Sequence, residues 1–263
     1  MTTGDARLRR HYDEKYAAEA AEQPVCYARR RYPANRFEAC VRYFPSSFPG
    51  GDVLEVGAGK GDIAFSLLTE NLKCTSYTLT DFSPVRTERL RRTIADPRCR
   101  FEILDVEAIP AERGAAYDAI VLVAVIEHLV DPLLAVRSLH RLLRPGGMLY
   151  IDTPNIAKFT RRIKLLAGRF PATATCNEGL SRADGSDVDL HDEGHLHYFS
   201  FRSLERMLTH YCGFASTRRL PYACGTPLAG TAIGHALARV WPAMFSELAV
   251  VAFTDGPRTA DAR

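Results

Sequence analysis

The feature that most limits the possible folds is an apolar segment that runs into three alternating glycines. Residues 53–62 read VLEVGAGKGD, which places glycines at positions 57, 59 and 61. Glycine lacks a Cβ and tolerates positive φ, so a ligand can lie directly against the backbone of such a turn. A helical segment at 63–70 follows, and the N–H groups at a helix start attract a carboxylate or phosphate. The pattern predicts a nucleotide-like ligand at the carboxyl edge of a parallel sheet.

The spacing of the glycines leaves the type of ligand open. The dinucleotide fingerprint is G-x-G-x-x-G, whereas Glu55, Gly57, Gly59 and Gly61 form the order E-x-G-x-G-x-G. A nicotinamide dinucleotide site and a simple strand-to-helix turn are both compatible with this segment alone. The choice between them depends on the rest of the chain.

Composition indicates an ordinary globular protein. The chain has 263 residues, 46% hydrophobic and 25% charged, which suits one α/β domain with insertions or two small domains. The formal net charge of +3 gives no reason to expect a nucleic-acid partner. Residues 1–15 contain no apolar signal core, and the apolar run 119–126 is too short to span a bilayer. We therefore expect no integral membrane segment and a cytoplasmic location.

The cysteines favour the same compartment. The chain has seven of them, scattered along its length and without any C-x-x-C pair. An odd number without metal-ligand spacing indicates free thiols rather than a disulfide framework or a zinc ribbon.

Strand-like and helix-like segments alternate between residues 52 and 153. Such alternation is typical of a parallel sheet that helices cover on both faces. The predicted strands are 53–56, 75–80, 100–104, 119–124 and 148–153, and the predicted helices between them are 63–70, 84–95 and 131–143. The preceding residues, 7–45, also look helical.

The regular alternation ends after Thr153. Residues 154–200 contain a basic segment and a polar stretch, together longer than an ordinary connection, so we expect a cap here. The predicted elements beyond it are helix 201–211, strand 214–219, a helix near 230–240 and strand 247–253.

Four more segments follow the glycine turn. They read YTLTDFS at 77–83, LDVEAIP at 104–110, DAIVLVAVIEHL at 118–129 and LRPGGML at 143–149. In this order they resemble the motifs of class I S-adenosylmethionine (SAM)-dependent methyltransferases. The resemblance implies an α/β, Rossmann-like, seven-stranded mixed sheet with helices on both faces, an antiparallel last strand and a helical cap. It also implies SAM as cofactor and S-adenosylhomocysteine as its product.

The C-terminal half has a narrower resemblance. PN at 154–155, a basic segment at 162–171, HLHYFS at 195–200 and GF at 213–214 resemble a methyltransferase subfamily often associated with sugar, polysaccharide or secondary-metabolite pathways. An insertion at 173–192 departs from that subfamily, which does not itself fix the acceptor. The expected organisation is an N-terminal helical lid at 1–45 and a methyltransferase domain at 46–263, with the cap inserted at about 154–200.

The resemblance also implies cofactor contacts. The glycine turn would hold the methionine half of SAM, Asp81 the ribose hydroxyls, and Asp105 with the backbone of Val106 the adenine edge. An aspartate after a strand also serves as an ordinary cap or loop residue. Tyr12 and Tyr16 lie four residues apart and would close over the cofactor as a lid. The expected contacts are Glu55, Gly57, Ala58, Gly59, Gly61, Asp81, Phe82, Asp105, Val106, Val123 and Tyr16.

Methyl transfer needs alignment and exclusion of water more than covalent help. For a hydroxyl acceptor a nearby base helps, and histidine is the usual candidate. His128, His191 and His195 are the candidates; His195 is favoured over His197, because alternate residues of an extended segment face opposite sides. Each can instead be a packed structural histidine. Residues 191–197 offer metal-ligand types but lack an H-E-x-x-H pattern, so no metal is expected.

The combined prediction is an enzyme that transfers the methyl group of SAM to O or N of a small polar metabolite or sugar-type acceptor. The alternatives are a nicotinamide-dependent oxidoreductase and a non-catalytic SAM-binding partner protein. The basic segment 158–169 is compatible with a phosphate-bearing acceptor, with an anionic membrane surface and with a solvated helix face. A homodimer is also compatible with the sequence.

Overall fold

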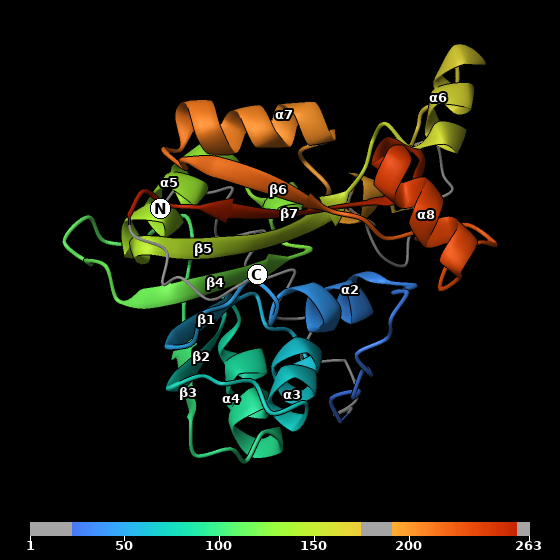
Figure 1. Cartoon of the computed structure of the whole chain (residues 1–263). Helices are drawn as coiled ribbons and strands as arrows, with labels where there is room; N and C mark the ends of the chain where they lie inside the picture. Colours follow the sequence, from blue (N-terminus) through green and yellow to red (C-terminus); the bar gives the residue numbers. More distant parts are fainter. Residues whose placement is uncertain (1–22, 175–190, 257–263) are drawn as a thin grey trace, which may run out of the picture.

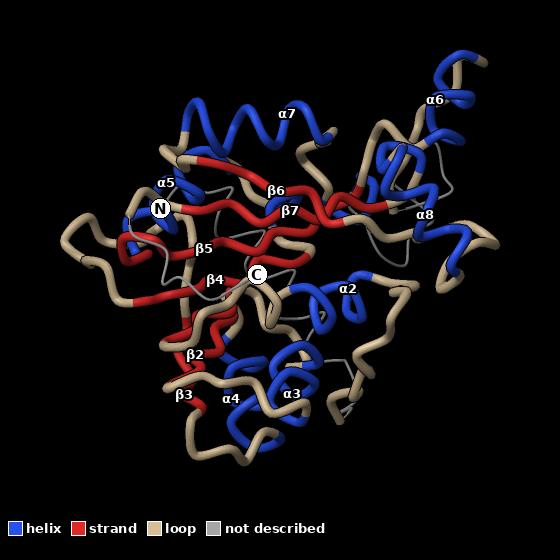
Figure 2. The backbone as a smooth tube through the Cα atoms, in the orientation of Figure 1, coloured by secondary structure: helices blue, strands red, loops and turns tan. Residues whose placement is uncertain are grey.

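The structure, a computed structural model, describes residues 23–174 and 191–256. A single seven-stranded sheet runs through its centre (Figures 1 and 2). The strand order is β3-β2-β1-β4-β5-β7-β6. The strands are β1 (Asp52–Val56), β2 (Ser76–Asp81), β3 (Cys99–Ile103), β4 (Tyr117–Val123), β5 (Leu143–Pro154), β6 (Ser216–Leu220) and β7 (Glu247–Phe253).

The directions of the strands make the sheet mixed. Neighbouring strands from β3 across to β5 pair in parallel, and β7 pairs antiparallel with both β5 and β6. The predicted seven-stranded Rossmann-like sheet with an antiparallel last strand is therefore confirmed. The chain order reverses between β1 and β4, and in parallel sheets a ligand crevice forms at such a point.

Helices cover both faces of the sheet, as expected. One face carries α5 (Pro132–Leu142) and α7 (Phe201–Arg206), and the other carries α2 (Arg36–Tyr43), α3 (Asp62–Thr69) and α4 (Pro84–Thr93) (Figure 1). Successive strand residues alternate between the two faces. Leu54 and Ile120 accordingly belong to the core under α5 and α7, and Val53 and Val121 to the core under α2 and α3.

Two further helices, α6 (Phe159–Leu166) and α8 (Ala232–Val240), lie beyond one end of the sheet (Figure 1). The buried Arg161 of α6 donates hydrogen bonds to four backbone carbonyls. This member of the basic segment therefore ties α6 to the body of the protein and does not form part of a solvated face. The four carbonyls belong to Asn155, Ala172, Thr173 and Ser246.

The N-terminal stretch differs from the expectation of a helix over 7–45. Among its described residues only Arg36–Tyr43 are helical, and residues 23–35 run irregularly beside α3. Prolines at 24 and 33 disfavour helix at and before their positions. The N–H of Val25 donates to Asp62 at 2.8 Å, which holds the irregular segment on the first turn of α3. Residues 1–22 lie outside the described ranges.

The other predicted elements are present with shifted ends. The largest shift is in β5, which begins at Leu143 rather than at 148, because Leu143 already pairs with Tyr117 ahead of a register shift. The helix predicted over 201–211 is α-helical to Arg206 and continues as a π-helical turn, Met207–Tyr211.

The structure also bears on the cysteines and on membrane segments. Every cysteine in the described ranges is a free thiol. Within those ranges, no helix has both the length and the apolar character needed to cross a bilayer.

Candidate active site

The candidate site lies where β1, β2, β4 and β5 reach their carboxyl ends. The glycine turn follows β1, Asp81 ends β2, and residues 124–128 follow β4. The antiparallel β7 begins at the same edge, since Glu247 pairs with Pro154 at the end of β5. Side chains from these ends converge, because the carboxyl ends of parallel strands share one edge of the sheet.

The three glycines of the turn all have positive φ, of 68°, 58° and 84°, but for different structural reasons. A Cβ on Gly57 would lie 2.5 Å from Val125 Cγ2, and one on Gly61 would lie 2.5 Å from a side chain at the end of α4. A Cβ on Gly59 would meet only the guanidinium of Arg86, at 3.4 Å. Gly57 and Gly61 therefore let the turn pack against the protein, whereas Gly59 leaves its outer face open for a ligand.

Asp81 lies beside this open turn. Its Oδ2 accepts the N–H of Gly59 at 3.1 Å and its Oδ1 accepts the N–H of Ser83 at 2.9 Å. Burial raises the pKa of Asp81, against the opposing effects of these N–H groups and of Arg86. Each carboxylate oxygen can accept a second hydrogen bond, so the pair suits the two hydroxyls of a ribose. The open backbone at Gly59 and the carboxylate of Asp81 thus fit the predicted cofactor.

Glu55 points away from the turn surface. Its side chain is buried, and its Oε2 accepts the hydroxyl of Tyr77 at 2.7 Å. Burial raises the pKa of Glu55 to about 8, although the bonds from Tyr77 and from the N–H of Ala64 oppose the shift. Since this carboxylate is bonded inside the protein, a contribution of Glu55 to cofactor binding would act through the turn it supports.

Asp105 and Val106 follow β3 in a short turn. Oδ1 of Asp105 accepts the N–H of Glu107 at 3.1 Å, which is ordinary loop chemistry for aspartate. The side chain of Val106 is buried in the core, so only its backbone is available to an adenine edge.

The remaining expected cofactor residues border the same edge. Ala58 is held by its N–H, which donates to the carbonyl of Thr80 at 2.8 Å. Val123 ends β4 and is buried, while Phe82 is partly buried directly after Asp81. Tyr16 lies outside the described residues.

Strain is present where the chain leaves β4. Ala124 has a φ of 55°, in the left-handed region that favours glycine. Its N–H donates to the carbonyl of Asp152 at 2.9 Å, which holds the strained residue against β5. Backbone strain of this kind is often found at functional sites. The next residues form a 3-10 turn, Ile126–His128, at this edge of the sheet.

Three acid–base side chains meet just past β4, and we call Glu127, His128 and His195 the trio. One potential ligand atom from each lies within 4.8 Å of the other two. The two imidazole rings are edge to face, with centroids 4.7 Å apart. The carbonyl of Glu127 accepts the N–H groups of Leu196 and His197 at 2.8 and 3.1 Å, which ties the loop carrying His195 to the end of β4.

His195 is buried and oriented by a chain of hydrogen bonds. Its Nδ1 lies 2.6 Å from Oγ1 of Thr173, and this hydroxyl donates to Asp192 at 2.7 Å. The hydroxyl therefore accepts from Nδ1–H, which leaves the lone pair on Nε2. Burial, with His128 alongside, lowers the pKa of His195 to about 4, so the ring is neutral at neutral pH.

Glu127 is the site residue that sequence reasoning missed. Its Oε2 accepts the hydroxyl of Thr153 at 2.9 Å, whereas its buried Oε1 has no hydrogen-bond partner in the described part of the chain. Burial raises the pKa of Glu127 to about 7. Its position beside His128 at the exit of an apolar strand was the available signal.

A second polar layer borders the trio. Arg36 of α2 forms an ion pair with Glu247 at 3.1 Å, and Tyr222 donates its hydroxyl to Asp152 at 2.7 Å. Burial raises the pKa of Asp152 strongly, with Glu247 adding to the shift. The end of β5 and the start of β7 thus supply further carboxylates near the trio.

The other predicted histidines lie elsewhere. Nε2 of His197 contacts the carbonyl of Val130 at 3.2 Å. The backbone of His191 begins a 3-10 turn, His191–Gly194, and its side chain is outside what the structure describes.

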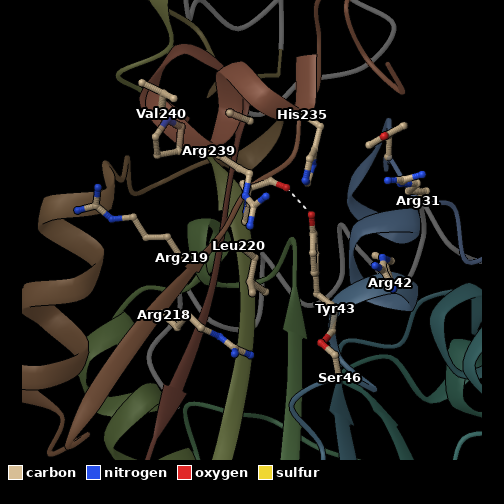
Figure 3. Close-up of a pocket in the computed structure, with 14 residues that line it drawn as sticks. Arg31, Arg42, Tyr43, Ser46, Arg218, Arg219, Leu220, His235, Arg239 and Val240 are labelled. Carbon is tan, nitrogen blue, oxygen red and sulfur yellow. Dashed lines mark hydrogen bonds between the residues drawn. The ribbon is translucent and has the colours of Figure 1, made fainter. Parts of the chain in front are cut away.

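A cationic cavity of about 760 Å³ lies between α2, the end of β6 and α8 (Figure 3). Five arginines line it, and in the described part of the chain no aspartate or glutamate does. Arg219 is neutralised by Glu205 at 2.6 Å, but Arg42 and Arg239 have no carboxylate partner among the described residues. The five are Arg31, Arg42, Arg218, Arg219 and Arg239.

The cationic cavity adjoins the polar layer through one strand end. Pro221 lines the cavity, and its carbonyl accepts the hydroxyl of Tyr43, a bond drawn in Figure 3. The next residue, Tyr222, donates to Asp152. The cavity is distinct from the glycine turn, none of whose residues lines it.

A family model described as a methyltransferase domain matches residues 27–216. The chain belongs to the methyltransferase-domain family. This membership confirms the resemblance to class I SAM-dependent methyltransferases, whose cofactor is SAM. The narrower C-terminal resemblance and the division into lid and domain stay predictions.

Individual relatives are more distant. The chain is 31% identical over 111 residues to a ubiquinone biosynthesis O-methyltransferase of Xanthomonas campestris pv. campestris. The aligned residues cover 41% of this chain and 45% of that protein. The match thus spans less than half of the relative's length.

Two solved structures show the same fold over most of the chain. One is the 1,6-didemethyltoxoflavin-N1-methyltransferase of Burkholderia thailandensis, with a TM-score of 0.55, 17% identity and coverage of 95% of this chain and 88% of that one. The other is the [4+2]-cyclase SpnF, with a TM-score of 0.57, 17% identity and coverage of 95% and 96%. At these identities the likeness shows the fold alone.

Proposed function

We propose that this protein transfers the methyl group of SAM to an oxygen or nitrogen of a small polar acceptor that carries an anionic group. One observation supports this most directly: the open glycine turn with Asp81 and the buried trio meet at the same edge of the sheet. The family match favours this function over the nicotinamide-dependent alternative.

The cofactor side is assigned as follows. The backbone around Gly59 would hold the methionine half, Asp81 the ribose, and Asp105 with the N–H of Val106 the adenine. When bound, SAM supplies a methyl group on a sulfonium: the acceptor lone pair forms the new bond to the methyl carbon, and the C–S electrons stay on sulfur. The protein must then align the acceptor and exclude water.

The trio is assigned to the acceptor. It follows β4, directly across the crevice from the glycine turn, because β1 and β4 are neighbours in the sheet. A hydroxyl acceptor has to lose its proton, and the trio offers a neutral His195 and the carboxylate of Glu127 for this step. The name of the Xanthomonas campestris relative, an O-methyltransferase, supports transfer to oxygen.

The cationic cavity is assigned to the anionic group of the acceptor. Unpaired guanidinium groups bind phosphate with good geometry, and the volume is within the range of small-molecule sites. The shared strand end at 221–222 would let one acceptor reach from the cavity to the polar layer. A sugar carrying a phosphate or diphosphate has suitable chemistry.

Two measurements test this function. Calorimetric titration should show that pyrophosphate binds to the protein. The double variant Arg42→Glu/Arg239→Glu should weaken this binding at least about tenfold. Arg202→Glu, which changes an exposed arginine of α7 away from the cavity, should leave it as it is. Labelled SAM should methylate a phosphorylated sugar more readily than its dephosphorylated counterpart. Equal pyrophosphate binding by all variants would remove the anion assignment, and SAM binding without transfer to any acceptor of the panel would favour a non-catalytic binding protein.

A further inference from the structure

We propose that Glu127, His128 and His195 bind a divalent first-row transition-metal ion. Each offers one ligand atom, and the three atoms lie within 4.8 Å of one another, so small side-chain movements bring them to a common ion at about 2.0–2.2 Å. Two imidazoles and one carboxylate suit Zn²⁺, Mn²⁺ or Fe²⁺, and three protein ligands leave further positions open. Glu127 and His195 are buried, and His128 is half-buried.

The unpartnered oxygen of Glu127 is the second observation that indicates a ligand. Glu127 is 1% exposed, and its Oε2 accepts from Thr153 while Oε1 has no donor among the described residues. Leaving a buried carboxylate oxygen without a donor is costly. A cation bound by the trio removes that cost, because it satisfies Oε1 directly.

Both imidazoles contact an oxygen through Nδ1, as metal-binding histidines commonly do through the nitrogen that does not bind the metal. Nδ1 of His128 contacts the carbonyl of Gly194 at 3.1 Å, and Nδ1 of His195 contacts the hydroxyl of Thr173, which donates to Asp192. Such bonds fix the tautomer and the ring orientation of a ligating histidine and increase its basicity. The same geometry would not be needed for two histidines that only pack in a core.

The surrounding charges are compatible with a cation. Arg36 and Arg161 lie close enough to affect the trio, but Arg36 is paired with Glu247 and Arg161 is bonded to four carbonyls. Asp192, which lies beside His195, adds negative charge on the same side. Of the stretch 191–197, from which no metal was expected, only His195 contributes a ligand; the other two come from the end of β4.

The ion would activate a hydroxyl acceptor, a role that rests on the proposed function, whereas metal binding itself does not. In that case Glu127 and His195 would act as ligands and not as bases. A hydroxyl at an open position would have a lowered pKa and would release its proton to water. The oxygen lone pair then forms the bond to the methyl carbon, and the electrons of the broken C–S bond stay on sulfur. An acceptor oxygen is therefore favoured over an acceptor nitrogen.

The test is metal binding to the full chain after treatment with a chelator. Mn²⁺ titrated by electron paramagnetic resonance, with Zn²⁺ as competitor, should report one site per chain. Glu127→Gln and His195→Gln should weaken it at least about 100-fold. Thr173→Val, which removes the hydroxyl between His195 and Asp192, should weaken it about tenfold. His197→Gln is the matched control and should bind like the wild type.

Binding of S-adenosylhomocysteine, measured on the same samples, separates the two proposals. Variants that lose the metal but keep this ligand are folded and support the metal site. Absence of a stoichiometric site in the wild type, or equal metal affinity in all four variants, would overturn it, whatever happens to the cofactor. If the wild-type protein bound the metal but not S-adenosylhomocysteine, the metal site would stand and the proposed function would be contradicted.

Discussion

At the scale of single residues, the clearest functional assignment is Asp81. Its carboxylate is buried at the end of β2, and its oxygens accept backbone N–H groups that include those of Gly59 and Ser83. In this orientation the remaining lone pairs would be available to the ribose diol of the proposed cofactor site. The residue is therefore positioned by the protein before any ligand binds.

Replacing Asp81 by Asn should weaken S-adenosylhomocysteine binding at least about tenfold, because hydrogen bonds to a charged group contribute about 1.5–3 kcal/mol. Calorimetric titration measures the change. The control is Asp96→Asn, which breaks an ion pair with Arg98 before β3 and should leave the affinity as it is. An unchanged affinity in Asp81→Asn would remove the ribose assignment.

Glu55 should make the stability of the protein fall as the pH rises. Its pKa is about 8 when folded, above its ordinary value of 4.5, so the unfolded chain loses the proton first. The stability that the protonated form provides is complete below pH 4.5 and is lost as the pH rises through about 8. The loss between pH 5 and pH 8 is on the order of 3 kcal/mol.

Glu55→Gln cannot titrate and keeps an acceptor for Tyr77, so its free energy of unfolding should fall less over this range. Urea unfolding of both proteins at pH 5 and pH 8 measures the difference. Parallel pH dependence in the two proteins would show that Glu55 is ionised in the fold.

At the scale of elements, the glycine turn combines two functions in three residues. Gly57 and Gly61 are required by packing against Val125 and α4, and Gly59 by access to the backbone. The turn is tied to β2 by the N–H of Ala58, so its position follows the sheet. Substitutions at the three positions should therefore have different consequences.

Gly57→Ala should unfold at a markedly lower temperature, because its Cβ would overlap Val125. Gly59→Ala should lose only about 1–2 kcal/mol of stability, the cost of a left-handed φ in an L-residue. Gly59→Val should still fold, but it should lose S-adenosylhomocysteine binding, because its side chain would occupy the open face of the turn. Thermal unfolding together with ligand titration distinguishes these outcomes, and normal ligand binding by Gly59→Val would place the cofactor elsewhere.

The elements were predictable from the sequence where the pattern is local. Alternating apolar segments and the glycine spacing predict the parallel strands, the turn after β1 and the acid at the end of β2. The inward direction of Glu55 was not predictable, because it depends on Tyr77 from the neighbouring strand. The prolines at 24 and 33 already disfavour a helix over residues 23–35, but the docking of this segment depends on Asp62 and Ser66 of α3 and was not predictable.

At the scale of the whole molecule, the fold brings together residues that no local pattern connects. The trio joins the end of β4 to a loop far along the chain, and His195 is oriented by Thr173 and Asp192, the first and last residues of the insertion. The cationic cavity likewise combines α2, β6 and α8. The sequence identifies His195 as a candidate, but Glu127 and the cavity required the three-dimensional arrangement.

The central claim is that the crevice between β1 and β4 binds the cofactor of a methyltransferase. Calorimetric titration of the full chain with S-adenosylhomocysteine, beside an identical titration with NADH, tests it most directly. The account predicts binding of S-adenosylhomocysteine with a micromolar dissociation constant and no heat from NADH. Binding of NADH alone, or of neither ligand, would contradict it.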